Sequence, residues 1–289
     1  MSPLRRSSRY PFLQFGLITI LLVTSLNAQS TYNFQTIDFP GGSSTQGRGV
    51  NQQGDIVGLY TDPSTGLIHG FRLSRKIFSK IDFPGATQTY PRGINATGTI
   101  VGFFADSSGI FHGFQLDSAG YEQIDVPGSF GTTARAITDN GLIVGDYSPD
   151  NVTNACYVLK GGSFSTFSFP GETINTCTGI SRRGDVLGYY TTTDDFSFVR
   201  RLGRFTPIAV PGATFEDPLG MNDLDQVVGF YTDSNGVQHG YMADIALVTI
   251  VDPPGAGFST ARGINGNGVI VGNYSMAGVG HGFVATPVP

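Results

Sequence analysis

The stretch IFSKIDFPGATQTYPRGINATGTIVGFFADSSGIFHGFQLDSAG, residues 77–120, contains four short segments with strand-like composition. FSKIDF ends at Pro-Gly, PRGIN ends in an Asn-x-x-Gly turn, TIVGFFAD ends in Asp-Ser-Ser-Gly and FHGFQLD ends at Ala-Gly. Asn, Asp and Gly in such positions are typical of tight β-hairpins. The stretch therefore predicts four antiparallel strands.

The same unit recurs six times along the chain. Pro-Gly closes one strand of each unit, with its glycine at Gly41, Gly85, Gly128, Gly171, Gly212 and Gly255. A second glycine, preceded by two apolar residues, recurs in step at Gly58, Gly102, Gly145, Gly188, Gly229 and Gly272. Four-stranded repeats of about 43 residues are typical of propeller blades. We therefore expect an all-β, six-bladed β-propeller with four-stranded blades; an open β-solenoid is the alternative.

The two ends of the repeat region predict how the ring closes. The first unit opens with a Pro-Gly strand, YNFQTIDFPG, whereas the last ends with HGFVATP and has no Pro-Gly strand after it. If the Arg-Gly-Ile-Asn strand is innermost, the last blade lacks its outer strand. We expect residues 33–39 to supply that strand beside residues 260–286.

Residues 1–28 have the composition of a secretory signal peptide. Arg5, Arg6 and Arg9 precede an apolar segment over residues 15–26, and Ala28 offers a small residue for cleavage. The apolar segment is shorter than the roughly 20 residues that span a bilayer. An uncleaved anchor is the alternative. We expect residues 29–289 to form a single propeller domain that is secreted or extracellular, with a periplasmic or cell-surface location also open.

Charge limits the partners of this domain. The whole chain carries a net charge of −5, and removal of residues 1–28 takes away three arginines and no acid, which leaves −8. Nucleic acids and anionic membrane surfaces require basic patches, so we expect neither as a partner. No second apolar segment of spanning length follows, so we expect no transmembrane span after processing, and a monomer.

The unit resembles the extracellular HAF repeat, named for a His-Ala-Phe tripeptide that reads His-Gly-Phe here. The motifs IDFPGA, GIN-x-x-G, IVG-x-Y and HGF occur in several copies, and the resemblance covers roughly residues 33–284. It implies a secreted bacterial protein with a propeller-like fold. No biochemical activity comes with the resemblance.

The two cysteines fall in adjacent units. Cys156 takes the place of the glycine of a His-Gly-Phe, and Cys177 directly precedes Thr178-Gly179-Ile180 in the next unit. The strand order puts both positions on the same face of neighbouring blades, and export permits a disulfide. We expect a Cys156–Cys177 bridge, with two unpaired buried thiols as the alternative.

Two charged columns recur together. Aspartates occupy the Pro-Gly strands, and arginines follow them by ten residues: Asp38, Asp82, Asp125 and Asp252, then Arg48, Arg92, Arg135 and Arg262. The other two copies carry Ser168 and Ala209 in the acidic column and Thr178 and Leu219 in the basic one. We expect structural Asp–Arg pairs that lock the outer strand of one blade to the inner strand of the next. The alternative is a ring of arginines around the axis that binds an anionic ligand.

Every histidine stands before a glycine and an aromatic residue, as His69, His112, His239 and His281, and Ala155 and Phe196 replace it in the other copies. Three histidines that share a zinc ion must lie within about 4 Å of one another. Equivalent strands of separate blades stand farther apart, so we expect no metal site here. We expect structural histidines that hydrogen-bond a loop backbone.

Catalytic motifs are missing from the sequence. Glu172 and Glu216, with Asp217 beside it, fall in successive loops on the face that also carries the arginines. They are ligand-face candidates that could support acid–base chemistry or hold calcium, with exposed loop charges as the alternative. We assign no catalytic residue and no other cofactor.

Of the possible functions, we expect a binding or interaction module for an unknown extracellular protein, glycan or small molecule. An extracellular hydrolase or lactonase-like enzyme with carboxylates or a metal at the axial opening is the alternative. A purely structural surface protein is a third possibility.

Overall fold

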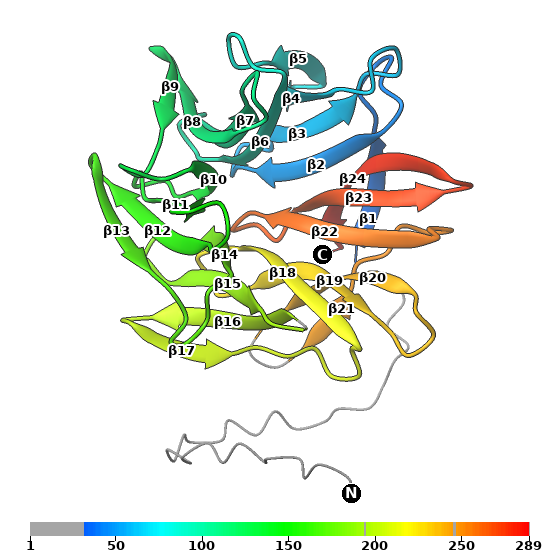
Figure 1. The fold of residues 1–289 in the computed structure, drawn as a ribbon. Helices are drawn as coiled ribbons and strands as arrows, with labels where there is room; N and C mark the ends of the chain where they lie inside the picture. Colours follow the sequence, from blue (N-terminus) through cyan, green and yellow to red (C-terminus); the bar gives the residue numbers. More distant parts are fainter. Residues whose placement is uncertain (1–31, 194, 245–246, 289) are drawn as a thin grey trace, which may run out of the picture.

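The chain folds into a ring of six blades around a central axis (Figure 1). The computed structural model describes residues 32–193, 195–244 and 247–288, which form 24 strands. Each blade is a four-stranded antiparallel sheet, which confirms the predicted six-bladed propeller. The predicted signal peptide, residues 1–28, lies outside the described residues. Within the described part, no helix has the length and apolarity needed to cross a membrane.

Strands run from the axis outward in chain order within each of the first five blades. Blades 1 to 3 comprise β2 (Thr45–Val50), β3 (Ile56–Thr61), β4 (Ile68–Ser74) and β5 (Ile77–Ile81); β6 (Gln88–Ile94), β7 (Ile100–Ala105), β8 (Phe111–Asp117) and β9 (Gly120–Ile124); and β10 (Gly131–Ile137), β11 (Ile143–Ser148), β12 (Ala155–Lys160) and β13 (Ser163–Phe167). Blades 4 to 6 comprise β14 (Asn175–Ile180), β15 (Val186–Thr191), β16 (Asp195–Arg201) and β17 (Arg204–Pro207); β18 (Phe215–Met221), β19 (Val227–Thr232), β20 (Gln238–Ala243) and β21 (Val248–Ile250); and β22 (Phe258–Ile264), β23 (Ile270–Met276), β24 (Val279–Pro287) and β1 (Tyr32–Ile37).

Each second strand has a glycine at its centre. The missing side chain leaves room there for the backbone of the innermost strand and for an aromatic ring of the third strand. A Cβ atom on Gly145 would overlap the carbonyl oxygen of Thr133 and would lie 2.9 Å from the hydroxyl of Tyr157. The third-strand aromatics at this position are fully buried: Phe71, Phe114, Tyr157, Phe198, Tyr241 and Phe283. The glycine column therefore has the packing role expected from its recurrence.

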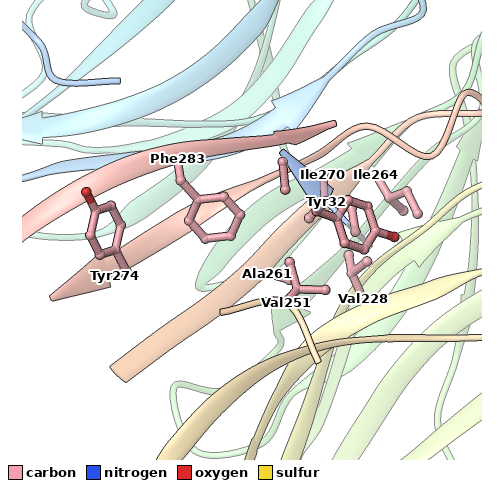
Figure 2. Packing of buried hydrophobic residues seen from close by; sticks show 9 residues of the cluster. Tyr32, Val228, Val251, Ala261, Ile264, Ile270, Tyr274 and Phe283 are labelled. Carbon is pink, nitrogen blue, oxygen red and sulfur yellow. The ribbon is translucent and has the colours of Figure 1, made fainter. Parts of the chain in front are cut away.

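The N-terminal strand closes the ring, as predicted. β1 pairs antiparallel with β24 from Tyr32 opposite Pro287 to Ile37 opposite Gly282, and it forms the outer strand of blade 6. Tyr32 is buried in one cluster with Ile264, Ile270 and, from blade 5, Val228 (Figure 2). The two ends of the chain thus share one hydrophobic core.

A disulfide joins blades 3 and 4, which confirms the predicted pairing. Cys156 on β12 is bonded to Cys177 on β14, with their Cα atoms 5.7 Å apart, and both residues are fully buried. A bridge across about 20 residues stabilises a fold by about 3 kcal/mol, chiefly by restricting the unfolded chain.

Deleting residues 1–42 should cripple folding. The deletion removes β1, which leaves the edge of β24 unpaired and opens the core around Ile270 to water. We expect the deleted protein to lose its cooperative thermal transition or to melt at least about 10 °C lower. A chain that begins at residue 32 keeps β1 and is the control; equal melting temperatures for the two would contradict closure by this strand.

Gly145→Ala should destabilise the protein by about 3 kcal/mol or more, because the new methyl group overlaps the Thr133 carbonyl. Gly257→Ala is the matched control, since a Cβ there would meet its nearest atom, the Ser275 oxygen, at an ordinary 3.7 Å. Denaturant unfolding measures both variants. Similar losses for the two would argue against close strand approach at Gly145.

Candidate functional site

A β-bulge in every innermost strand turns one residue toward the axis. In β2 the register shifts between Gly47 and Gly49, so that Arg48 has no partner on β3. The same shift occurs in the other five blades, and bulges re-aim side chains in this way. The bulged residues, which line one cavity, are Arg48, Arg92, Arg135, Thr178, Leu219 and Arg262.

Glycines that follow the bulged residues bring the inner strands close together. A Cβ on Gly49 would lie 2.7 Å from the carbonyl oxygen of Arg92, and one on Gly263 would lie 2.6 Å from that of Arg48. Real Cβ atoms do not approach so closely, so these positions require glycine. The narrow spacing of the inner strands is what gathers side chains from separate blades into one cavity.

The axial cavity is small and positively charged on one side. It encloses about 40 Å³, and its four arginines come from the contiguous blades 6, 1, 2 and 3. Thr178 and Leu219, from blades 4 and 5, form its neutral side. Guanidinium groups match the geometry of carboxylate, sulfate and phosphate groups, so the cavity can take a compact anion.

Counter-charge within the ring is incomplete. Arg135 forms an ion pair with Asp146 on β11. The other three arginines form no ion pair among the described residues. Arg262 donates to the Asn273 side chain at 2.6 Å and also feels the charge of Asp217. Arg48 donates to the Gln46 side chain, and Arg92 lies over the Phe103 ring at 5.0 Å. The Nε atoms of Arg48 and Arg92 are buried without a hydrogen-bond partner among the described residues. Unsatisfied buried donors of this kind call for a partner.

The pKa values reflect this shortage of negative charge. Burial and then the neighbouring arginines lower the pKa of Arg48 well below its ordinary value and that of Arg92 to about 9. Burial lowers the pKa of Arg262 to about 10. Burial acts in the same direction on Arg135, but the adjacent Asp146 outweighs it and the pKa rises.

The predicted Asp–Arg pairs are wrong. Among the described residues, no ion pair joins Asp38, Asp82, Asp125 or Asp252 to an arginine of the ring, and each contacts a histidine of its own blade instead. The Nδ1–carboxylate distances are 2.8 Å for His281–Asp38, 2.9 Å for His69–Asp82, 2.9 Å for His112–Asp125 and 2.6 Å for His239–Asp252.

Strand order explains the error. The aspartate follows the outermost strand and the arginine lies on the innermost one, so two other strands, each about 4.8 Å wide, separate them radially. The histidine lies on the third strand, next to the aspartate. Ser168 and Ala209 replace aspartate in the two blades in which Ala155 and Phe196 replace histidine. The histidine and aspartate columns thus lose their members in the same two blades, as a contact between them requires.

Aromatic rings complete these histidine positions. The ring of a second-strand aromatic lies 5.2–5.6 Å from each imidazole: Tyr60–His69, Phe104–His112, Tyr231–His239 and Tyr274–His281. The expected backbone partner is thus replaced by a carboxylate and a ring. No group of three or more His, Cys, Asp or Glu side chains suited to a metal ion occurs among the described residues.

The three acidic candidates differ in position. Glu172 lies in a turn before β14, partly exposed and away from the cavity lining. Glu216 and Asp217 lie within β18 rather than in a loop. The Glu216 carboxylate accepts a hydrogen bond from the backbone N–H of Val210, as hydroxyls of Thr45, Thr89 and Thr132 do in other blades. This hydrogen bond therefore links the segment that follows the outer strand β17 to the innermost strand of the next blade, β18.

Asp217 is the acid that the structure brings near the ring. It precedes the bulged Leu219 by two residues. Burial, then the charge and hydrogen bond of Asp195 on β16, raise the pKa of Asp217 to about 7, against the opposing charge of Arg262. One carboxylate oxygen, Oδ1, is buried without a hydrogen-bond partner among the described residues. The sequence pattern singled out Asp217 but gave no sign of Asp195.

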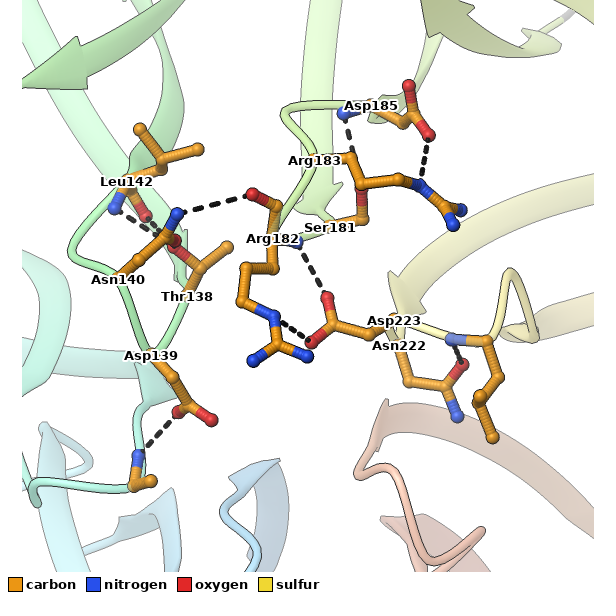
Figure 3. A network of polar contacts seen from close by, with 12 residues as sticks. Thr138, Asp139, Asn140, Leu142, Ser181, Arg182, Arg183, Asp185, Asn222 and Asp223 are labelled. Atoms are coloured by element: carbon orange, nitrogen blue, oxygen red, sulfur yellow. Dashed lines mark hydrogen bonds and ion pairs between the residues drawn. The ribbon is translucent and has the colours of Figure 1, made fainter.

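Hydrogen bonds join neighbouring blades at the ends of the innermost strands. Asn51 donates to the backbone oxygen of Asn95 at 3.1 Å, and Asn265 donates to that of Asn51 at 2.9 Å, so these side chains link neighbouring blades. In blades 3 to 5, the Asn140 side chain donates to the backbone oxygen of Arg182, and the backbone N–H of Arg182 donates to the Asp223 carboxylate (Figure 3). These contacts lie at the strand-end side of the ring, opposite the starts of the innermost strands.

Comparison with known proteins gives matches in structure alone. No family model and no curated protein matches the sequence. A mutant of the Aleuria aurantia lectin AAL, solved with Fucα1-6GlcNAc, is 12% identical over 86% of this chain and 97% of its own, with a TM-score of 0.54. AofleA from Arthrobotrys oligospora is 13% identical over 91% of this chain and 92% of its own, with a TM-score of 0.52.

TolB from Acinetobacter baumannii also matches, at 14% identity, over 84% of this chain and 54% of TolB, with a TM-score of 0.51. At such identities a structural likeness shows the fold and nothing further. The chain therefore has the β-propeller fold, which it shares with the Aleuria aurantia lectin and with TolB.

Proposed function

We propose that this protein is an exported binding module that takes an anionic group into the axial arginine cavity. One observation carries the proposal: four arginines from contiguous blades converge on a cavity of about 40 Å³ with one ion-paired carboxylate, Asp146, among them. Buried charges are costly unless they are paired, and removal from bulk water strengthens their attraction for an anion.

Binding accounts for the cavity better than hydrolysis does. Of the described residues that line it, none is a carboxylate, a histidine or a cysteine, the groups that most often transfer protons or attack substrates. The alternative, a hydrolase, would place carboxylates or a metal at this opening. Arginine instead provides charge and fixed hydrogen-bond geometry.

Export is supported by the disulfide and by the N-terminal sequence. Disulfides persist in oxidising compartments, and residues 1–28 have the order of a signal peptide. The HAF-type repeat motifs point in the same direction. We therefore assign the binding module to the HAF repeat family and to the cell exterior as part of this proposal.

Sulfate should stabilise the protein through the ring. We expect sulfate to raise the melting temperature more than chloride at equal ionic strength, and Arg92→Gln to weaken sulfate binding at least about tenfold, because a charged donor is lost. Without sulfate, Arg92→Gln should be neutral or stabilising, since it removes repulsion within the ring. Thermal shift and calorimetry measure these effects.

Arg204→Gln provides the control for this experiment. Arg204 is exposed on the outer strand β17 and lies outside the cavity lining, so its replacement should leave sulfate binding unchanged. An equal sulfate response in all three proteins would mean that sulfate acts on the whole surface and would refute the axial site.

Sulfate binding should weaken as the pH rises from 6 to 8. Asp217 gains its negative charge as the pH passes its pKa of about 7, and this charge near Arg262 opposes an anion. We expect a loss of about three- to tenfold in affinity over this range. Asp217→Asn should remove most of the dependence. A wild-type slope that persists in the variant would exclude Asp217 as its source.

A further inference from the structure

We propose that the anion is the carboxylate of a uronic-acid sugar, and that the sugar ring lies between Tyr90 and Asp217 next to the arginine cavity. This inference rests on the proposed function and names the ligand class. The size of the cavity, the two walls of the layer beside it and the charge of the site support it.

The cavity has room for the anionic group of the ligand, so the rest of the ligand must lie outside it. A space of about 40 Å³ holds a carboxylate but not a sugar ring. Buried asparagines link neighbouring blades at the strand-end side of the axis, and we place the sugar ring on the opposite, strand-start side. The next layer there contains the residues two positions before each bulge, including Gln46, Tyr90 and Asp217, which are all partly exposed.

One wall of this layer is aromatic. Tyr90 on β6 stacks on Phe103 on β7 with ring centroids 4.7 Å apart, and Phe111 on β8 meets Phe103 edge-on at 5.2 Å. Phe111 is 42% exposed, while Phe103 is buried against the guanidinium of Arg92. The row therefore runs from solvent to the cavity and offers an apolar surface to the C–H face of a sugar ring.

The opposite wall accepts hydrogen bonds. Asp217 belongs to blade 5, which lies across the six-bladed ring from blade 2, and Asp195 comes from blade 4 beside it. The Oδ1 atom of Asp217 is buried without a hydrogen-bond partner among the described residues. A donor from a ligand would satisfy this oxygen, and carboxylates commonly accept from hydroxyl groups.

Charge favours hydroxyl donors over an ammonium group. Four arginines stand against three nearby carboxylates, Asp146, Asp195 and Asp217, so the site keeps a positive charge and repels a second cation. An amino acid would bring such a cation beside its carboxylate. A uronic acid combines a carboxylate, neutral hydroxyls and an apolar ring face, which are the three features that the site can bind.

Calorimetry on the full chain at pH 8 tests this inference. The probes are glucuronate, galacturonate and mannuronate, with acetate, glucose, benzoate and phenylalanine for comparison. We expect at least one uronate to bind about ten times more tightly than acetate, and glucose to show no binding. Tyr90→Ala and Asp217→Ala should each reduce the uronate-to-acetate affinity ratio at least about fivefold, because each removes one wall of the sugar layer. Glu172→Ala, which removes a carboxylate outside the cavity lining, should leave the ratio unchanged.

Sulfate binding by each variant shows that the fold and the arginine cavity are intact. Uronates that bind no better than acetate would overturn the sugar assignment while sulfate binding upheld the anion site. Tighter binding of benzoate or phenylalanine would replace the sugar with an aromatic acid or an amino acid. A wild-type protein that binds neither sulfate nor any carboxylate would refute the proposed function as well.

Discussion

The close approach of backbone to backbone at the axis is the constraint on which the rest of this structure depends. Glycine after the bulge in five of the six blades lets neighbouring inner strands meet, and glycine in each second strand admits a buried aromatic ring beside an inner-strand carbonyl. A methyl group at most of these positions would overlap a backbone atom. The same approach that builds the core therefore also forces four guanidinium groups into one small space.

The contacts that stabilise the propeller differ with distance from the axis. Asparagine side chains link the inner strands, and His–Asp pairs with a stacked aromatic link the third and outer strands in four blades. Blades 3 and 4 lack the His–Asp pair, and the Cys156–Cys177 bridge joins these two blades. The two blades without an internal His–Asp pair are therefore joined to each other by a covalent link. Blade 4 also provides Thr178 of the neutral side of the cavity and Asp195.

Repeat spacing was enough to predict the fold, because a column that recurs every 43 residues or so must occupy the same place in every blade. The prediction that Arg48 and its equivalents pair with the recurring aspartates failed because more than two columns of residues vary together. Histidine, aspartate and arginine columns all have members missing in the same part of the ring, so joint loss alone could not say which two side chains touch. Radial order along the blade decides that question, since it places histidine beside aspartate and arginine at the axis.

By itself, the sequence determined the number of blades, their strand order, the closing strand around Tyr32 and the neighbours that form the disulfide. These features follow from local turn chemistry and from periodicity, which act along the chain. Tertiary structure alone decided that the arginines converge, because the bulge that turns Arg48 inward is a property of strand pairing. It also decided the burial of Asp217 beside Asp195, since the two residues belong to different blades and meet only when the ring closes.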